Sequence, residues 1–381
     1  MDFQLTEEQL MIRQMAREFA REEVAPHAAE IDEKSEFPIA ATRKMAELGY
    51  MGMMIPQEWG GSGLDTISYC LVMEEISVAC ASTAIAMSVN NSLFCWPIFK
   101  FGTDDQKKRY LVPFARGEKL GAYALSEPAS GSDAAGMKTV ARKVGGRYIL
   151  KGTKNFITNG PQANATIVFA LTDPSKKHKG ISCFIVEKEF RGYAIGKIEK
   201  KLGIRASSTS EIVLDDCEVP ASNILGQEGD GFKIAMATLD GGRIGVGTQA
   251  LGIARAAFEQ ARDYSKQREA FGQPISDFQA IQHYLADMAL KIDASRLLLW
   301  RAAWMKDQGL PFTKEAAMAK LHASEAAMWV THKAVQILGG YGFCKDYPVE
   351  RFFRDAKITE IYEGTSEIQR LVIARNILKD L

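Results

Sequence analysis

Glu363 is the residue of this 381-residue sequence whose setting best fits a general base. Residues 361–370 read Ile-Tyr-Glu-Gly-Thr-Ser-Glu-Ile-Gln-Arg, so a glycine follows the glutamate and two hydroxyl residues then cap a predicted helix over 367–379. We therefore expect the carboxylate on a short, irregular approach to a helix, where Gly364 lets backbone and ligand come close. A carboxyl group that is partly desolvated at a cavity wall has a pKa raised towards that of a useful base. A solvated loop glutamate is the alternative, and this segment alone leaves it open.

Three further segments could contribute to a binding site. The stretch 124–133, Ala-Leu-Ser-Glu-Pro-Ala-Ser-Gly-Ser-Asp, follows a short predicted strand and is rich in small and hydroxyl residues. Such a loop can present backbone N–H groups and serine hydroxyls to a phosphate or an electron-rich ring. The segment 156–160 (Phe-Ile-Thr-Asn-Gly) ends another predicted strand, and 336–342 (Gln-Ile-Leu-Gly-Gly-Tyr-Gly) ends a predicted helix. Each pattern also has a simpler explanation: a polar turn for 124–133, core packing for 156–160 and a helix C-cap for 336–342.

Composition and charge indicate an ordinary globular protein. Apolar residues make up 46% and charged residues 25%, and 47 Lys and Arg balance 47 Asp and Glu. This balance does not favour a protein that binds nucleic acid or an anionic membrane. No apolar run approaches the ~18 residues that a membrane span needs. The sequence predicts a soluble, cytoplasmic protein of bacterial type, or one of the mitochondrial matrix if a transit peptide has been removed.

Cysteine and histidine give no sign of a disulfide framework or a metal centre. The six cysteines form no Cys-x-x-Cys pair, and we expect reduced thiols that are mostly buried. The five histidines are scattered and form no His-Glu-x-x-His pattern. No metal site is therefore predicted.

Hydrophobic periodicity divides the chain into three units. Residues 1–118 are predicted to be helical, residues 119–225 to form a small antiparallel β domain, and residues 226–381 to form a helical bundle without strands beyond Gly231. A hairpin is expected around Gly145 and Gly146. The predicted helices cover residues 6–31, 38–48, 66–81, 84–101, 103–117, 246–268, 277–307 and 313–338. The predicted strands cover residues 139–144, 147–151, 165–171, 181–186 and 211–214.

Together these segments resemble the acyl-CoA dehydrogenase family along essentially the whole chain. Residues 124–133 with Gly136 fit the first signature of the family, and the segment that begins at Gln336 resembles the second. Residues 361–370 resemble its catalytic segment, while Phe156 stands where many members have tryptophan. The resemblance implies a mainly α fold with a central β domain: an N-terminal helical domain, a middle antiparallel β domain and a C-terminal four-helix bundle.

The resemblance also implies bound FAD. Ser126 and Thr158 are expected to hydrogen-bond the isoalloxazine edge. Arg268 and Phe271 are expected to reach the flavin nucleotide of a neighbouring subunit, so a homotetramer is implied. Electron-transferring flavoprotein is the implied electron acceptor. The implied cofactor-binding residues are Tyr123, Leu125, Ser126, Phe156, Ile157, Thr158, Arg268, Phe271, Gln279, Gln336, Gly339, Gly340, Thr365 and Glu367.

For the substrate, the resemblance implies an acyl-CoA thioester that is oxidised to the trans-2-enoyl-CoA, as in fatty-acid β-oxidation. Glu363 would remove the α-proton, and flavin N5 would accept the β-hydride. The Glu363 backbone N–H and a flavin ribityl hydroxyl would bind the thioester carbonyl, and Arg243 would hold the CoA moiety through a fixed donor fork. The implied substrate-binding residues are Ser132, Asp240, Gly241, Arg243, Tyr362, Gly364, Ile85, Val89 and Leu93.

Two predicted helices bear on the choice of substrate. Isovaleryl-type and long-chain relatives carry their base on the helix that here reads Leu-Asp-Gly-Gly-Arg over 239–243, where Gly241 and Gly242 leave Glu363 without a competitor. Residues 84–99 contain no Arg or Lys, which argues against a dicarboxylic substrate. The segment 239–243 and the two residues after it look most like short-chain, butyryl-CoA-type enzymes.

An apolar stripe on the second of these helices agrees with a short acyl chain. Ile85, Val89 and Leu93 fall at i, i+4 and i+8 on one face, although periodicity alone would also fit ordinary core. Three alternatives remain open: a branched or cyclic acyl-CoA, an oxidase that reacts directly with oxygen, and a catalytically silent flavoprotein on the same scaffold.

Overall fold

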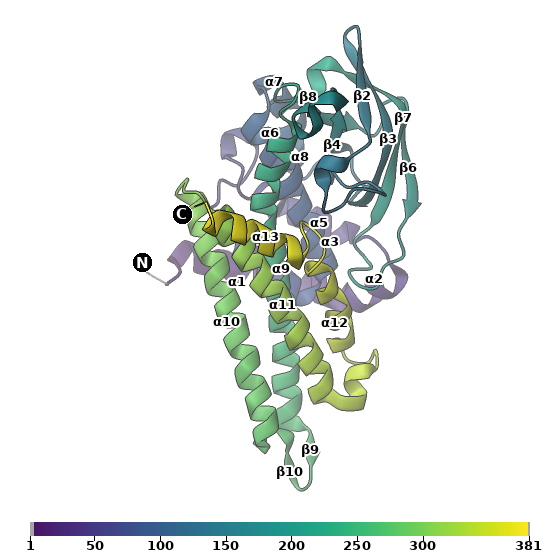
Figure 1. Ribbon diagram of the computed structural model, residues 1–381. Helices are drawn as coiled ribbons and strands as arrows, with labels where there is room; N and C mark the ends of the chain where they lie inside the picture. The colour runs from purple at the N-terminus through teal and green to yellow at the C-terminus, as the bar shows by residue number, and fades with distance from the viewer. Residues whose placement is uncertain (1–3, 380–381) are drawn as a thin grey trace.

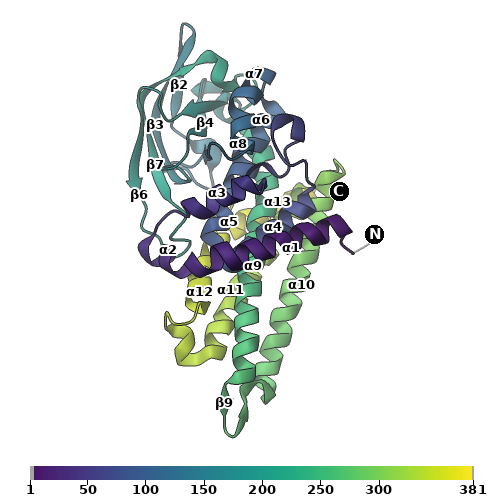
Figure 2. The same ribbon diagram turned by 180° about the vertical axis from the view of Figure 1, so that it is seen from behind.

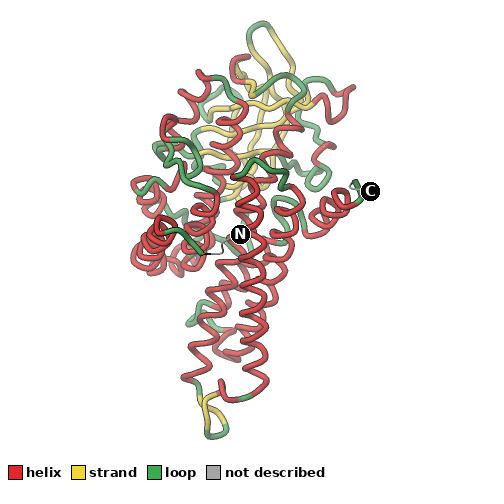
Figure 3. Tube along the Cα trace, turned by 90° about the vertical axis from the view of Figure 1, so that its left-hand side faces the viewer, coloured by secondary structure: helices red, strands yellow, loops and turns green. Residues whose placement is uncertain are grey.

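The computed structural model describes residues 4–379, in which three long helices run side by side and a β-sheet covers one end (Figures 1 and 3). The N-terminal helix crosses the long helices on the side seen in Figure 2. The predicted fold class, mainly α with a central β domain, is confirmed. Within residues 4–379 no helix is both long and apolar enough to cross a membrane.

The first unit begins as the sequence predicts. The Thr6 hydroxyl and the Gln9 side chain form a capping box at the start of α1 (Glu7–Phe19). Near Pro26, which cannot donate a backbone hydrogen bond, short irregular turns interrupt the predicted helix over 6–31. The other elements of this unit are η1 (Ala20–Val24), η2 (Ala25–His27), α2 (Ala28–Lys34), α3 (Ile39–Glu47), η3 (Tyr50–Gly52), η4 (Gln57–Trp59), α4 (Thr66–Ala79), α5 (Ala81–Ser88), η5 (Val89–Cys95), α6 (Trp96–Phe101), α7 (Asp104–Gln106), η6 (Lys107–Leu111) and α8 (Val112–Ala115).

The helix predicted over residues 84–101 contains a π-helical segment, η5, which the periodicity did not predict. Two buried amides lie in it. Asn90 accepts a hydrogen bond from the Gly121 N–H at 2.9 Å, and Asn91 accepts one from the Met53 N–H at 2.7 Å. Because π-turns shift the side-chain period away from 3.6, residues 85, 89 and 93 do not keep a strict α-helical stripe.

The middle of the chain forms a mostly antiparallel sheet with strand order β6-β7-β3-β2-β4-β5-β8, and β1 pairs in parallel with β4. The predicted hairpin is confirmed, since Val144 lies opposite Arg147 across the Gly-Gly turn. Strand β6 was not predicted, because its residues are mostly half-exposed or exposed and show no apolar alternation. The strands are β1 (Gly121–Ala124), β2 (Val140–Val144), β3 (Arg147–Thr158), β4 (Ala165–Leu171), β5 (Ile181–Glu187), β6 (Tyr193–Ile198), β7 (Thr209–Pro220) and β8 (Ile224–Leu225); short helical turns are η7 (Ala134–Gly136), η8 (Pro174–Gly180) and η9 (Ala221–Asn223).

The C-terminal unit differs from its prediction at three points, one of which is the unpredicted helix α12 (Val349–Thr359). Helix α9 (Gly231–Gln267) begins well before residue 246, although the glycines of its first half lower the helix propensity by about 1 kcal/mol each. Packing overrides propensity here, because a Cβ at Gly245 would lie 2.7 Å from the Tyr69 hydroxyl. Strands β9 (Glu269–Ala270) and β10 (Gln273–Pro274) form a small hairpin where no strand was expected. The remaining elements are η10 (Ile275–Asp277), α10 (Gln279–Asp307), α11 (Thr313–Leu338), η11 (Gly339–Phe343), α12 (Val349–Thr359) and α13 (Ser366–Ile377).

One large hydrophobic core joins the helices to one face of the sheet. Phe169 and Ile185 of the sheet belong to the same buried cluster as Ile244 of α9, while a second cluster lies on the other side of the strands. Burial of this apolar area is the main force that fixes the sheet against the bundle. We propose that the three units divide near residues 118 and 225; residues 1–3 and 380–381 of the outer units lie outside the described part.

Candidate active site

Glu363 lies between α12 and α13 in a left-handed turn. Its φ is +52° and that of Gly364 is +98°. An irregular approach to a helix was expected, and Thr365 caps α13 by accepting a hydrogen bond from the Ile368 N–H at 3.3 Å. The left-handed conformation of Glu363 itself was not foreseen. It costs a non-glycine residue about 1–2 kcal/mol and persists only where the surroundings hold it.

Two buried side chains hold the carbonyl groups of this turn. Lys320 of α11 donates a hydrogen bond from Nζ to the Gly364 carbonyl at 2.7 Å. Gln369 of α13 donates from Nε2 to the same carbonyl at 2.8 Å and to that of Glu363 at 3.2 Å. Both side chains belong to fully buried residues. The sequence analysis missed them; the available signal was the alanine-rich, apolar surroundings of Lys320 in α11.

The Glu363 carboxylate is desolvated. Its Oε2 atom is buried and has no hydrogen-bond partner within the described part of the chain. Burial raises the pKa of Glu363 to about 7, although the positive charges of Lys320 and Arg243 act against this rise. Burial also lowers the pKa of Lys320 to about 8, opposed by the charge of Glu363. Near neutral pH, Glu363 can therefore both take up and release a proton.

The glycine pair of α9 and Leu93 of η5 lie against this carboxylate. A Cβ at Gly242 would overlap Oε2 of Glu363 and would lie 3.0 Å from Cδ2 of Leu93. A Cβ at Gly241 would meet no atom within 4 Å. The structure thus brings Leu93, Gly242 and Glu363 together, with open space beside Gly241.

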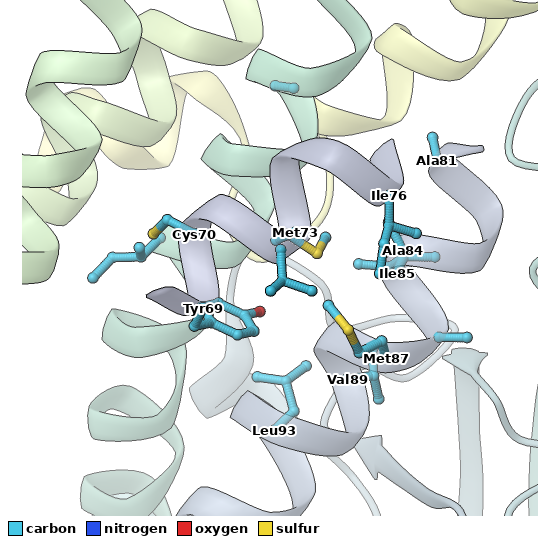
Figure 4. Close-up of a cluster of buried hydrophobic side chains, with 14 of the residues drawn as sticks. Tyr69, Cys70, Met73, Ile76, Ala81, Ala84, Ile85, Met87, Val89 and Leu93 are labelled. Carbon is cyan, nitrogen blue, oxygen red and sulfur yellow. The ribbon is translucent and has the colours of Figure 1, made fainter. Parts of the chain in front are cut away.

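Ile85 and Val89 lie in the buried cluster that Figure 4 shows, with Leu93, Tyr69 and Met73 around them. The Tyr69 hydroxyl is 2.8 Å from Ser88 Oγ, which joins α4 to α5. Leu93 connects this cluster to the carboxylate, because a Cβ at Gly242 would lie 3.0 Å from Leu93 Cδ2 and would overlap Glu363 Oε2. The three predicted pocket residues therefore line one buried region.

Asp240 and Arg243 form an ion pair one turn apart on α9. Arg243 Nη1 lies 2.5 Å from Asp240 Oδ1, and the Thr313 hydroxyl donates to Asp240 Oδ2 at 2.6 Å. Burial raises the pKa of Asp240 and lowers that of Arg243, and each charge opposes the shift of the other. Arg243 Nε is buried and unpartnered among the residues described here. Ser132, by contrast, is exposed on its loop.

Tyr362 is fixed from the opposite side of the turn. Its hydroxyl donates a hydrogen bond to Gln249 Oε1, and Gln249 donates from Nε2 to the Ala81 carbonyl at 2.8 Å. This chain links the Glu363 turn to α9 and α5. Since Tyr362 precedes Glu363, it restricts where the carboxylate can go.

A buried ion pair fixes the loop after β1. Lys154 Nζ lies 2.8 Å from Glu127 Oε1, and Glu127 also accepts hydrogen bonds from the Lys138 and Thr139 N–H groups at 2.6 and 3.0 Å. Burial lowers the pKa of Lys154 to about 8. The pair ties β3 to both ends of the 124–139 loop. The sequence did not predict this ion pair, because a single lysine in a strand is normally expected to be exposed.

The predicted flavin-edge residues lie on this loop and on the end of β3. The Asn155 N–H donates to the Ser126 carbonyl at 2.9 Å, so the two segments that carry Ser126 and Thr158 are joined. Phe156 has a φ of +61° and is 63% exposed, so its ring does not pack in the core. Leu125 and Ile157 are buried beside them. The Tyr123 hydroxyl is buried and has no partner within residues 4–379. Burial raises its pKa, and the negative charge of Glu363 adds to this rise.

The other predicted cofactor residues lie at the far end of the bundle. Figure 1 shows β9 and β10 at the end opposite to the sheet. Tyr264, Tyr341 and Tyr347 form ring contacts at 5.7–6.5 Å there and connect the end of α9 with η11. Phe271 is 96% exposed with a φ of +52°. The exposed residues of this distal group are Arg268, Phe271, Gln279, Gln336, Gly339 and Gly340. Thr365 and Glu367 lie with Glu363 instead.

Other features do not add a second chemical centre. No cluster of metal-ligating side chains occurs within residues 4–379. Five cysteines are buried and Cys344 is exposed. A cavity of about 720 Å³ opens between α1, α4, α9 and α12, and the Glu363 turn does not line it. Its lining arginines include Arg17 and Arg255, both already paired with Glu75.

Comparison with known proteins identifies the family. Residues 6–118, 122–217 and 229–378 match, in order, the N-terminal, middle and C-terminal domains of acyl-CoA dehydrogenase. The chain belongs to the acyl-CoA dehydrogenase family. It is 54% identical over 379 residues to the short-chain specific acyl-CoA dehydrogenase of Clostridium acetobutylicum, with all of both chains covered.

Solved structures agree with this assignment. Butyryl-CoA dehydrogenase from Megasphaera elsdenii superposes with a TM-score of 0.98 at 49% identity, covering 99% of this chain and 100% of the other. An acyl-CoA dehydrogenase from Bacillus anthracis, complexed with FAD, superposes with a TM-score of 0.93 at 38% identity and covers 99% of this chain and 68% of the other. The protein is thus an oxidoreductase of the acyl-CoA dehydrogenase type, and FAD is its cofactor.

The chemistry of the site fits FAD. A flavin ring needs hydrogen-bond partners at its polar edge and apolar contact on its faces. Both kinds of group occur here: the Tyr123 hydroxyl has no partner within residues 4–379, the segments of Ser126 and Thr158 are joined, and the Phe156 ring is exposed.

Proposed function

We propose that this enzyme oxidises a short-chain acyl-CoA to the trans-2-enoyl-CoA, with Glu363 as the base. The observation that carries the proposal is a desolvated carboxylate, unpartnered within the described residues, in a turn that its neighbours hold rigidly. A structural carboxylate oxygen that is buried, as Glu363 Oε2 is, normally has a hydrogen-bond partner. One left without a partner, with a pKa of about 7, suits proton transfer with a bound substrate.

The reaction removes two hydrogens of opposite character. The α-proton is acidic because its anion delocalises into the thioester carbonyl, and Glu363 accepts this proton. The Glu363 backbone N–H is proposed to bind the thioester oxygen, where negative charge grows in the transition state. When bound, FAD supplies the acceptor for the β-hydride. The rigid turn would hold the base in a fixed position relative to the substrate, and such positioning lowers the activation free energy by several kcal/mol.

The chain's own residues are proposed to hold both ligands. Ser126, Thr158 and Tyr123 would hydrogen-bond the flavin, Phe156 would contact its ring, and Leu125 and Ile157 would support these residues. Thr365 and Glu367, which follow the base in the chain, would also bind the flavin. Arg243 and Asp240, with Ser132, Gly241, Tyr362 and Gly364, are proposed to contact the acyl-CoA. Ile85, Val89 and Leu93 are proposed to line a short, apolar acyl pocket.

The distal group is proposed to serve a neighbouring subunit. Within one chain the β9–β10 hairpin lies at the opposite end of the bundle from the sheet, and Arg268 and Phe271 directly flank β9 (Figure 1). A homotetramer would bring them to the flavin nucleotide of another subunit. The exposure of Phe271 supports this proposal, since within residues 4–379 its ring contacts only the ring of Phe278.

Electron-transferring flavoprotein is proposed as the electron acceptor, by analogy with the family. Rates of flavin reoxidation with this acceptor and with oxygen distinguish a dehydrogenase from an oxidase. The proposed location is the cytoplasm, or the mitochondrial matrix if a transit peptide has been removed.

Anaerobic flavin reduction tests the proposed function. Butyryl-CoA should bleach the FAD-loaded protein, and Glu363→Gln should keep FAD and acyl-CoA binding but lose more than the 10²–10⁴-fold typical of general-base removal. Retention of most activity by this variant would reject Glu363 as the base. A panel of straight, branched and cyclic acyl-CoAs identifies the substrate, and no bleaching by any of them would indicate a silent flavoprotein.

A further inference from the structure

Lys320 is a buried cation beside the Glu363 turn. It lies on α11, is fully buried, and donates from Nζ to the Gly364 carbonyl at 2.7 Å. Its backbone packs against α9, where a Cβ at Gly247 would come within 3.3 Å of the Lys320 Cα. Burying an ammonium group is costly unless hydrogen bonds and charge compensate it. One carbonyl compensates it only in part.

The charged groups around this lysine come from three elements and from the turn. The charges of Glu363, Arg243, Glu360 and Glu367 act on Lys320. The charges of Lys320 and Arg243 act on Glu363, and the charge of Glu363 acts on the hydroxyls of Tyr69, Tyr123 and Tyr362. Arg243 is already paired with Asp240. Lys320 has no carboxylate oxygen within 4.0 Å in the described part of the chain, so its charge is not neutralised by a direct ion pair.

We propose that Lys320 is a positioning residue, which fixes the Glu363–Gly364 turn through the Gly364 carbonyl and stabilises the ionised carboxylate of Glu363 through space. This inference rests on the proposed role of Glu363 as the base. Lys320 itself does not exchange a proton with the substrate.

A substitution at Gln369 makes it possible to separate the hydrogen bond of Lys320 from its positive charge. It binds the same Gly364 carbonyl at 2.8 Å but carries no charge. Lys320→Met therefore removes one hydrogen bond and the charge, whereas Gln369→Leu removes hydrogen bonds alone. The Gly364 carbonyl keeps one donor in either variant, so neither leaves it buried and unsatisfied. Methionine is long, flexible and apolar, and it suits the buried site of the lysine side chain.

The test is a pH series of anaerobic flavin reduction by butyryl-CoA with the FAD-loaded variants. For Lys320→Met we expect the pH midpoint of the reduction rate to rise by about one unit, since a nearby opposite charge shifts a carboxyl by about that much. The rate at neutral pH should fall about tenfold, with KM changed less than about threefold. Gln369→Leu should slow reduction without moving the midpoint. Lys320→Arg, which keeps the charge, should restore the wild-type midpoint.

A second measurement does not depend on turnover. The infrared band of the protonated Glu363 carboxyl, identified by its loss in Glu363→Gln, gives the titration midpoint directly, and it should rise in Lys320→Met. If that variant does not assemble, Lys320→Gln replaces it in both measurements. An unchanged midpoint in the neutral variant overturns the inference. Full activity of Glu363→Gln rejects the proposed base instead, a result that the infrared titration distinguishes from failure of the Lys320 proposal.

Discussion

Gly242 of α9 faces Oε2 of Glu363 so closely that a Cβ atom on residue 242 would overlap this oxygen. At the next position towards the N-terminus, Gly241, a Cβ would meet no atom within 4 Å. The two glycines therefore have different roles. Gly242 makes room for the base, and Gly241 borders open space.

This difference predicts opposite results for two alanine substitutions. Gly242→Ala should displace the Glu363 carboxylate and slow flavin reduction by at least about tenfold, because a shift of the order of 1 Å in a catalytic group is costly. Gly241→Ala is the matched variant, and it should raise the free energy of unfolding by up to about 1 kcal/mol, because alanine is the better helix former. Urea unfolding and anaerobic reduction measure the two effects. Equal behaviour of the two variants would contradict the close approach at Gly242.

Burial of Glu363 should destabilise the protein above neutral pH. Its pKa in the folded protein is about 7, above the ordinary value of 4.5, so the unfolded chain releases the proton first. The stability associated with the protonated carboxyl is fully present below pH 4.5 and is lost as the pH rises through 7. As the pH rises from acid to neutral, the free energy of unfolding of Glu363→Gln should therefore increase relative to that of wild type. The expected increase is a few kcal/mol, at about 1.4 kcal/mol per unit of pKa shift.

Urea unfolding of both FAD-loaded proteins over this pH range measures the gain. Glu8→Gln, which removes an exposed carboxylate of α1, controls for the loss of a charge. A constant difference between Glu363→Gln and wild type at all pH values would show that the carboxyl of Glu363 is not desolvated.

The sequence predicted the larger elements because their signals are local. Capping residues marked the start of α1 and of α13, and the Gly-Gly turn marked the β2–β3 hairpin. The start of α9 was missed because its early glycines oppose helix formation. Tertiary contacts explain two of them, since a Cβ at Gly242 would overlap Glu363 Oε2 and one at Gly245 would lie 2.7 Å from the Tyr69 hydroxyl. The π-helical segment η5 depends on hydrogen bonds from Asn90 and Asn91 to distant backbone groups, which no local pattern reveals.

The residues of the candidate site also fall into those that local motifs predict and those that depend on tertiary structure. Glu363 and the segments 124–133, 156–160 and 336–342 could be predicted as parts of a site because each motif is contiguous in the sequence. Lys320, Gln369 and the Lys154–Glu127 pair were not found, since each is a common surface residue type whose role depends on burial by elements far away in the chain. The left-handed φ of Glu363 likewise follows from those tertiary hydrogen bonds and not from its neighbours in sequence.

The Lys154–Glu127 pair should be important for stability and for FAD retention. Both side chains are almost completely buried, and loss of one partner of such a pair typically costs about 3–5 kcal/mol. Lys154→Met should therefore lower the free energy of unfolding by about this amount and loosen the 124–139 loop. Lys151→Met removes an exposed lysine from the same strand, at 3.7 Å from its acidic partners, and should cost less than about 1 kcal/mol. Equal costs in denaturant unfolding would contradict a buried pair.

Arg268 should matter for FAD in the assembled protein and not in an isolated subunit. If the distal group contacts the flavin nucleotide of a neighbour, Arg268→Ala should weaken FAD retention by about tenfold or more, the effect of losing one charge-assisted contact. Arg262→Ala, six residues earlier in the chain on α9 and paired with Asp263, is the matched control. FAD release on dilution, followed by flavin fluorescence together with molecular mass, measures the effect. A monomer that keeps FAD with unchanged affinity would exclude a shared site.

The acyl pocket should accept about four to six carbons. Ile85, Val89 and Leu93, which Figure 4 labels, are all at least 95% buried, and a Cβ at Gly242 would lie 3.0 Å from Leu93 Cδ2 and would overlap Glu363 Oε2. Because the π-helical segment begins at Val89, Leu93 does not follow Ile85 on a strict α-helical stripe. We propose that Leu93 limits the pocket near the carboxylate and that Ile85 and Val89 limit it further along the acyl chain. β-Branched Ile and Val are stiff at χ1 and do not swing aside easily. Each methylene that finds no room loses about 0.8 kcal/mol of burial and adds strain.

Values of kcat/KM across straight-chain acyl-CoAs test this limit. Butyryl-CoA should be close to the best substrate, and octanoyl-CoA should be much poorer. Ile85→Ala and Val89→Ala each open space deep in the cluster, at an expected cost of about 2–5 kcal/mol in stability for the larger truncation, and should move the optimum towards longer chains. Ile76→Ala, a truncation in α4 of a residue buried in the same cluster, controls for general loosening of the core. If octanoyl-CoA is the better substrate of the wild type, the pocket is not short. If the optimum stays at butyryl-CoA in both truncated variants, Ile85 and Val89 are core residues that do not line the pocket.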